Sequence, residues 1–195
     1  MEKHVSVKMN KTIISVLGIS GSLRRGSFNT ALINHAIRLA PEYIRIERFD
    51  ISGIPLYNED IRTGPGEPAI VTEFKKKIAE ADALLIASPE YNYSVAGVLK
   101  NAIDWASRPI NTSPFDNKPF GMMTAGGGLG AARAQYHLRQ MAVYLNMHPL
   151  NKPELFVPHA IEKFDREGNL IDSSIEERIV ILLEALYEWT IQLKK

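Results

Sequence analysis

Short apolar runs alternate with amphipathic helical patterns along the whole chain. The apolar runs, which are typical of buried β-strands, occupy residues 12–19, 43–50, 83–88, 120–125 and 154–157. Apolar positions at helical spacing occupy residues 28–39, 68–80, 98–107, 129–144 and 175–193. Strands that alternate with helices predict a parallel sheet with helices on both faces. Five such strands predict a doubly wound α/β fold with the strand order 2-1-3-4-5.

This pattern predicts one domain with a ligand site between two loops. The length of 195 residues fits a single domain over the whole chain, 1–195, in which residues 1–10 are expected to be a flexible N-terminal extension. In a sheet of this order, ligands bind beyond the carboxyl ends of the first and third strands. The loops after those strands begin at Ser20 and Pro89.

Three local features refine this picture. The segments 52–67 and 109–119 are rich in Pro, Gly and Asn and are expected to be surface loops. Ser173 and Glu176 have the spacing of a capping box, which predicts the start of the last helix.

Hydroxyl side chains gather between the first strand and the first helix, in the sequence GISGSLRRGSFNT of residues 18–30. The side chains that can hydrogen-bond an anion are Ser20, Ser22, Ser27, Asn29 and Thr30. A helix N-terminus adds free N–H groups and a positive dipole end, so this loop suits a phosphate. Neither G-x-G-x-x-G nor a loop ending in Gly-Lys-Ser/Thr is present, which favours a terminal monophosphate such as that of FMN. The alternative is that Ser27 and Asn29 merely cap the helix.

The loop PEYNYSVAG, residues 89–97, offers a platform for a flat ring. Tyr91 or Tyr93 can contact a ring face, and the backbone of residues 90–92 can contact its polar edge. The alternative is that Pro89 ends the strand and the tyrosines pack under the loop. Glu90 is not assigned as a general acid, because hydride transfer to a flavin needs no protein carboxylate.

Three consecutive glycines follow the fourth strand, at residues 126–128. They present only backbone, which can lie against a flavin edge and leave an open face for a second planar substrate. A flexible turn is the alternative. Arg133 and Arg139, on the next helix, are expected to face solvent or another subunit. Four histidines lack metal-ligand spacing and are expected to be surface or partly packed residues: His35, His137, His148 and His159.

Composition excludes several function classes. The net charge of +1 gives no electrostatic case for nucleic acid or an anionic membrane as the main partner. The chain has no cysteine, so disulfides, thiolate metal sites and cysteine nucleophiles are excluded. Since no apolar run approaches the ~20 residues of a membrane span and no export signal is evident, a cytoplasmic location is expected.

Taken together, GSLRRGSFNT, PEYNYSVAGVLKNAIDW and AGGGLGAARAQYHLRQ resemble the NADPH-dependent FMN reductase family of flavodoxin-like proteins. The similarity, which extends over residues 11–193, is strongest to members described as quinone, chromate or azo-dye reductases. It implies a flavodoxin-like sheet, bound FMN, NADPH or NADH as co-substrate, and a homodimer or dimer of dimers. One departure is Ala96, where many relatives have proline.

The motifs and the resemblance together give the expected cofactor contacts. The first group is Ser20, Ser22, Leu23, Arg24, Ser27, Phe28, Asn29 and Thr30. The second group is Pro89, Glu90, Tyr91, Asn92 and Tyr93, and the third is Gly126, Gly127 and Gly128. No metal site and no catalytic side chain are expected, because the reactive atom is N5 of FMN.

The expected function is an FMN-dependent oxidoreductase. It would transfer a hydride from NAD(P)H through bound FMN to quinones or other small electrophilic acceptors, in a two-electron ping-pong reaction. Three alternatives remain: a one-electron carrier of the flavodoxin kind, a redox-sensing module, and a reductase that releases free reduced FMN. The near-neutral charge argues against the carrier, because such carriers are usually strongly acidic.

Overall fold

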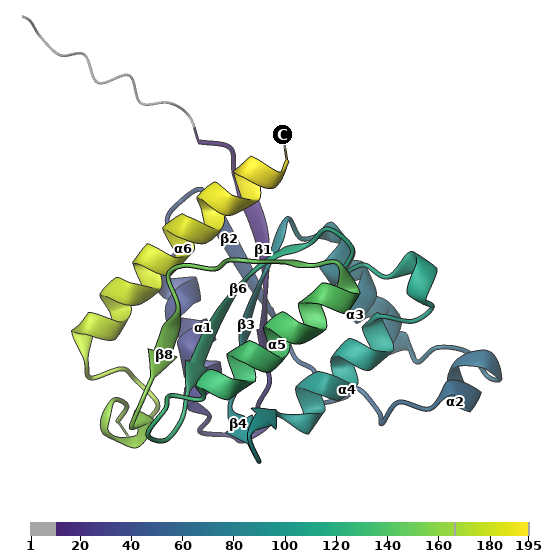
Figure 1. Ribbon diagram of the computed structural model, residues 1–195, viewed down its shortest axis with the longest axis horizontal. Helices are drawn as coiled ribbons and strands as arrows, with labels where there is room; N and C mark the ends of the chain where they lie inside the picture. The colour runs from purple at the N-terminus through teal and green to yellow at the C-terminus, as the bar shows by residue number, and fades with distance from the viewer. Residues whose placement is uncertain (1–10, 166, 195) are drawn as a thin grey trace, which may run out of the picture.

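A parallel sheet forms the centre of the molecule (Figure 1). The computed structural model describes residues 11–165 and 167–194, so the extension expected at residues 1–10 lies outside the described residues. The strands are β1 (Ile14–Ser20), β2 (Ile44–Phe49), β3 (Ala83–Ala87), β6 (Pro119–Ala125), β7 (His148–Pro149) and β8 (Leu155–Val157). Their order is β2-β1-β3-β6-β7, and β8 also pairs with β6. The predicted doubly wound, flavodoxin-like order is therefore confirmed.

The fifth position of the sheet differs from the prediction because two short strands share it. β7 pairs with Pro119 and Phe120 at the start of β6, whereas β8 pairs with residues 123–125 at its end. Pro149 and Pro153 have no backbone N–H, so one continuous ladder cannot run through this part of the edge. The predicted strand at residues 154–157 is thus confirmed, but it forms only half of the edge.

Helices cover both faces of the sheet, as predicted (Figure 1). They are α1 (Phe28–Leu39), α3 (Ala69–Glu80), α4 (Gly97–Ala106), α5 (Ala132–Leu145) and α6 (Ser173–Leu193). Helices α1 and α6 pack on one face, and α3, α4 and α5 pack on the other. Successive residues of a strand point to opposite faces, so Val16 belongs to the first core and Leu17 to the second.

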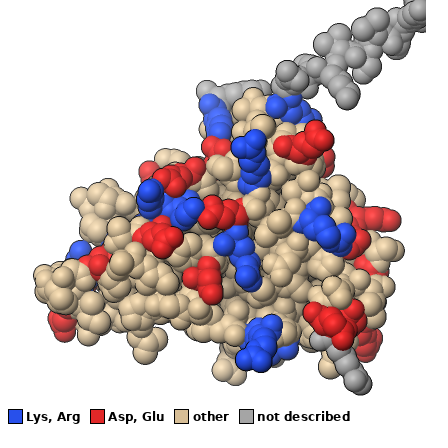
Figure 2. Space-filling model, turned by 180° about the vertical axis from the view of Figure 1, so that it is seen from behind, with Lys and Arg blue, Asp and Glu red and all other residues tan. Residues whose placement is uncertain are grey.

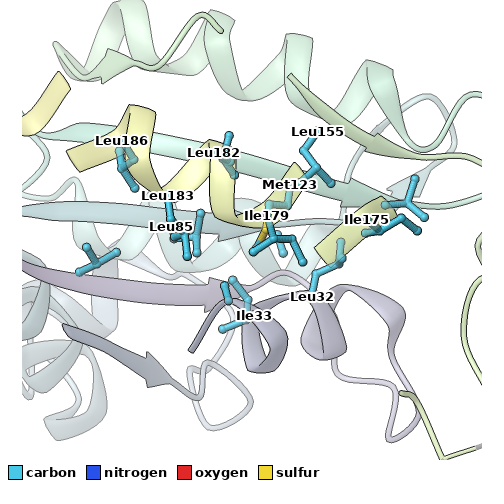
Figure 3. Close-up of a cluster of buried hydrophobic side chains, with 14 of the residues drawn as sticks. Leu32, Ile33, Leu85, Met123, Leu155, Ile175, Ile179, Leu182, Leu183 and Leu186 are labelled. Carbon is cyan, nitrogen blue, oxygen red and sulfur yellow. The ribbon is translucent and has the colours of Figure 1, made fainter. Parts of the chain in front are cut away.

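The core under α1 and α6 is closely packed (Figure 3). This core contains Leu32 and Ile33 of α1, Leu85 of β3, and Leu183 and Leu186 of α6. All five side chains are fully buried. Burying one such side chain contributes about 1.5–3 kcal/mol. The strands are therefore a rigid base for the loops at their carboxyl ends.

Several short elements lie where only loops were predicted. They are α2 (Glu59–Thr63), a hairpin of β4 (Glu90–Tyr91) and β5 (Ser94–Val95), and the 3₁₀ turns η1 (Ile110–Thr112) and η2 (Ala160–Glu162). The hairpin turns through Asn92 and Tyr93, whose φ angles are 51° and 67°. Two residues at positive φ form the tight turn that matches the twist of a hairpin.

The start of α6 also differs from the prediction. Asp172, not Ser173, is the N-cap, and its carboxylate accepts a hydrogen bond from the Ser174 N–H at 3.1 Å. A carboxylate and a hydroxyl are both good caps, and the carboxylate lies one position earlier.

Positive and negative side chains are interspersed on the face turned away from the view of Figure 1 (Figure 2). This fits the net charge of +1. The mixture on this face offers no field of a single sign to an extended anion such as a nucleic acid.

Candidate functional site

The three sequence motifs meet at one cleft. It has a volume of about 410 Å³ and lies at the carboxyl ends of β1, β3, β6 and β8. The expected contacts that line it are Ser22, Arg24, Ser27, Phe28, Asn29, Pro89, Glu90, Tyr91, Gly126 and Gly127. All three expected groups are represented, so loops that are far apart in the sequence form one site.

The loop at residues 20–30 is held by its own hydrogen bonds. The hydroxyls of Ser20 and Thr30 are 2.8 Å apart, and the Ser27 hydroxyl accepts the Thr30 N–H at 3.3 Å. Ser20 and Ser27 are buried. Since the first turn of a helix leaves N–H groups without intrahelical partners, the loop presents an ordered set of donors at the α1 N-terminus. Ser27 is thus a helix cap and also lines the cleft.

Asn29 joins the first motif to the third. Its amide donates to the Ala125 carbonyl at 3.0 Å and accepts the Ala125 N–H at 3.0 Å. The side chain is buried, and both of its polar groups are engaged. Through this pair of bonds, Asn29 fixes the start of α1 against the end of β6.

The hydroxyl loop also carries a cation, Arg24. The Arg24 guanidinium carbon is 5.0 Å from the centre of the Phe28 ring, which is within the range of a cation–π contact. Phe28 in turn stacks on Phe164, with ring centres 4.9 Å apart. Arg24 therefore lies at the cleft over a ring that is itself packed on Phe164.

The hairpin after β3 is fixed to α5 by an ion pair. The Glu90 carboxylate accepts the Arg133 N–H at 3.0 Å and is 2.8 Å from the Arg133 guanidinium. That guanidinium lies 3.8 Å from the centre of the Tyr93 ring. Ser94 and His137 add a hydrogen bond of 2.8 Å. Arg133 is therefore engaged within its own chain, whereas the sequence placed it toward solvent or another subunit.

The glycine loop is tied to the segment after β8 by backbone hydrogen bonds. Gly126 accepts the Ala160 N–H at 2.9 Å, and Gly127 accepts the His159 N–H at 3.0 Å. A Cβ atom added at Gly127 would meet no other atom within 4 Å. This position therefore leaves open space beside the cleft.

Four cleft residues were not predicted: Ala125, His159, Ala160 and Ile161. Three of them follow the last strand of the sheet. The predicted strand order could have identified them. It pairs the last strand with β6, so the segment after the last strand must lie beside the glycine loop that follows β6.

The other expected contacts lie outside the lining of the cleft: Ser20, Leu23, Thr30, Asn92, Tyr93 and Gly128. Ser20 and Thr30 support the loop from behind through their mutual hydrogen bond. Leu23, Asn92 and Tyr93 are exposed.

Two features are absent from residues 11–165 and 167–194, the part of the chain that the structure describes. No helix there is both long and apolar enough to cross a membrane. Nor do three or more His, Asp or Glu side chains there form a group that could hold a metal ion.

Comparison with known proteins gives the family of the chain. The sequence profile of the NADPH-dependent FMN reductase family matches residues 14–162. An NAD(P)H-dependent FMN reductase of Pseudomonas aeruginosa is 55% identical over 182 residues, covering 93% of this chain and 97% of that protein. An NADPH:quinone oxidoreductase of Arabidopsis thaliana is 47% identical over 190 residues, covering 94% and 95%.

A solved structure has the same fold. The flavoenzyme NAD(P)H:(acceptor) oxidoreductase of Paracoccus denitrificans superposes with a TM-score of 0.83 at 29% identity, covering 92% of this chain and 98% of that chain. The FMN expected from the motifs and the NAD(P)H implied by the resemblance are the cofactor and reductant named for that family, and the chain therefore belongs to the NADPH-dependent FMN reductase family.

Proposed function

We propose that the protein uses FMN bound in this cleft to reduce quinones or other small electrophilic acceptors with NAD(P)H, two electrons at a time. The observation that carries the proposal is the convergence of the hydroxyl loop, the hairpin and the glycine loop on one cleft. Relatives named as quinone oxidoreductases support the acceptor class.

The donors at one end of the cleft fit a phosphate. Ser22 and Ser27 would hold it with their hydroxyls and with the N–H groups at the start of α1. Arg24, held over Phe28, adds a positive charge at the same place. Charge-assisted hydrogen bonds are about twice as strong as neutral ones, so this end would supply much of the affinity.

The other end of the cleft fits a flat ring. Pro89 and Tyr91 offer apolar contact, and Gly126 and Gly127 offer backbone. When bound, FMN supplies the redox chemistry, because it can accept a hydride from a nicotinamide and pass two electrons to an acceptor. Both co-substrates would reach the flavin ring through the open space beside Gly127. They would enter in turn, which gives ping-pong kinetics.

The oligomeric state expected from the resemblance is part of the proposal. The outer side of α5 exposes Tyr136, Val143 and Tyr144. A homodimer or a dimer of dimers would cover such apolar side chains. Light scattering after size-exclusion chromatography measures the mass, and a monomer at micromolar concentration would contradict this part.

Anaerobic stopped-flow spectroscopy tests the reaction. The purified protein is expected to show oxidised flavin bands that bleach on mixing with NADPH and return on adding a quinone. If bleaching needs a separate reductase, the protein is a one-electron carrier. If the flavin passes through a dialysis membrane during turnover, the protein releases reduced FMN.

A further inference from the structure

His35 connects the first helix to the segment that follows β8. It lies on α1, and its side chain is buried. Its Nε2 atom accepts the backbone N–H of Leu170 at 3.1 Å. Leu170 forms an antiparallel bridge with Phe164. The buried side chain of His35 on α1 therefore holds the Phe164–Leu170 pair, which lies outside α1.

The contacts of the ring determine its protonation state. Because Nε2 accepts a hydrogen bond, the single proton of a neutral imidazole must lie on Nδ1. Nδ1 is 3.2 Å from a carboxylate oxygen of Glu176 on α6, to which it can donate. Arg38 of α1 also lies beside Nδ1, but a guanidinium can only donate, so with the proton on Nδ1 the hydrogen bond of Arg38 goes to Glu176 and not to the ring.

The surroundings favour this neutral form. Burial is the main cause that lowers the pKa of His35, and the charge of Arg38 lowers it further. Glu176 and Asp165 act in the opposite direction but are outweighed. These groups come from α1, from α6 and from the segment after β8.

A chain of contacts leads from His35 to the cleft. Phe164 is buried and stacks on Phe28, which lines the cleft and lies under Arg24. In the same segment, Ala160 and Ile161 line the cleft, and Ala160 is bonded to the glycine loop. Residues 159–164, here called the cleft wall, are thus attached at one end to the glycine loop and at the other to α1 through His35.

We propose that neutral His35 is a positioning residue of the cofactor site: by accepting the Leu170 N–H it keeps Phe164 against Phe28 and so holds Arg24 at the hydroxyl loop. This inference rests on the proposed binding of FMN in the cleft. A proton on Nε2 would place two N–H donors against each other and break the contact. FMN affinity would therefore depend on the protonation of a residue that does not touch FMN.

Two variants separate the hydrogen bond from the titration. His35→Gln keeps an acceptor for the Leu170 N–H but does not titrate, whereas His35→Leu removes the acceptor. His148→Gln, on β7, is the matched control, since it removes a histidine away from the cleft wall. The first readout is the hydrogen-exchange protection of the Leu170 amide in the FMN-free protein, measured by NMR.

The second readout is the dissociation constant of FMN, from quenching of its fluorescence, between about pH 8 and about pH 5. The phosphate of FMN itself titrates with a pKa near ~6, so each variant is compared with the wild type at the same pH. One lost hydrogen bond predicts roughly 3- to 10-fold weaker binding for His35→Leu at pH 8. His35→Gln is expected to bind like the wild type at pH 8 and to lose less affinity at pH 5.

The two readouts together distinguish a failure of the proposed role of His35 from a failure of the proposed FMN binding. Protection of the Leu170 amide in the wild type and in His35→Gln, lost in His35→Leu, together with the pH difference, supports the proposal. An unprotected amide in the wild type, or an FMN affinity of His35→Leu at pH 8 equal to that of the wild type, overturns it. A protected amide in a protein that binds no FMN at any pH contradicts the proposed function instead.

Discussion

The two ends of the cleft are built in different ways. At the phosphate end, side chains from one continuous stretch, residues 20–30, provide hydroxyls, a helix N-terminus and a cation. The ring end is lined by side chains and glycine backbone from segments separated in sequence. These segments are joined by the Glu90–Arg133 pair and by the hydrogen bonds between the cleft wall and the glycine loop. The motifs at both ends were visible in the sequence, whereas the hydrogen bonds and the ion pair that join distant segments at the ring end were not.

Asn29 joins the two ends, and its loss should have the largest effect. Asn29→Ala leaves the buried N–H and C=O of Ala125 without partners. Each unsatisfied group costs about 1–3 kcal/mol, so the free energy of unfolding should fall by about 2–6 kcal/mol. Calorimetry should then show a Tm roughly 4–24 °C lower. The exposed Asn111→Ala is the control, and equal Tm values for the two variants would show that the joint is unimportant.

A substitution at Gly127 tests whether substrates reach the ring end of the cleft through the open space beside this residue. Gly127→Val should fold normally, because the added side chain points where no atom lies within 4 Å. It should lower kcat/KM for a quinone roughly tenfold, or about 1.4 kcal/mol, by narrowing the mouth. Gly128→Val is a matched control, since Gly128 has the same open surroundings but does not line the cleft. If both variants keep full activity, the mouth is elsewhere.

The Glu90–Arg133 pair tests whether the ring end depends on contacts between segments. Glu90→Gln removes the charge but keeps the shape, and FMN binding should weaken by about 1 kcal/mol because the pair is partly exposed to solvent. The double variant with Arg133→Gln should be no weaker than the worse single variant, since the pair acts as a unit. Fully additive losses in FMN titrations would mean that the two residues act independently.

The smallest expected effect is on the pH dependence of stability. The pKa of His35 is lowered in the folded chain from its ordinary value of 6.5, so the unfolded chain binds this proton more readily. The stabilisation is present above that value and is lost as the pH falls below it. Between pH 7.5 and 5, the Tm of the wild type should fall more than that of His35→Gln. A steeper fall for His35→Gln would contradict the assignment of a neutral ring.

Much of the fold was predictable because short apolar runs and the helical period of 3.6 report directly on burial. Val16 and Leu17 on β1 and Leu32 on α1 follow those patterns into opposite cores. The split edge was missed because Pro149 and Pro153 act through missing N–H groups, which a hydropathy pattern does not register.

The candidate site was predictable only in part, for related reasons. Ser22 and Ser27 were identified because hydroxyls cluster beside a helix start. His159 and Ile161 were missed because no motif marks the segment after the fifth strand, although the predicted strand order already placed that strand beside the fourth. The partner of Arg133 was missed because Glu90 lies 43 positions away.

The central claim is that residues 20–30 bind the phosphate of FMN, and comparison of FMN with riboflavin tests it most directly. Fluorescence titration of the flavin-free protein measures both affinities under one condition. Two charge-assisted hydrogen bonds to the phosphate, at about 1.5–3 kcal/mol each, predict that FMN binds at least ~100-fold more tightly than riboflavin. Equal affinities for the two flavins would contradict the account.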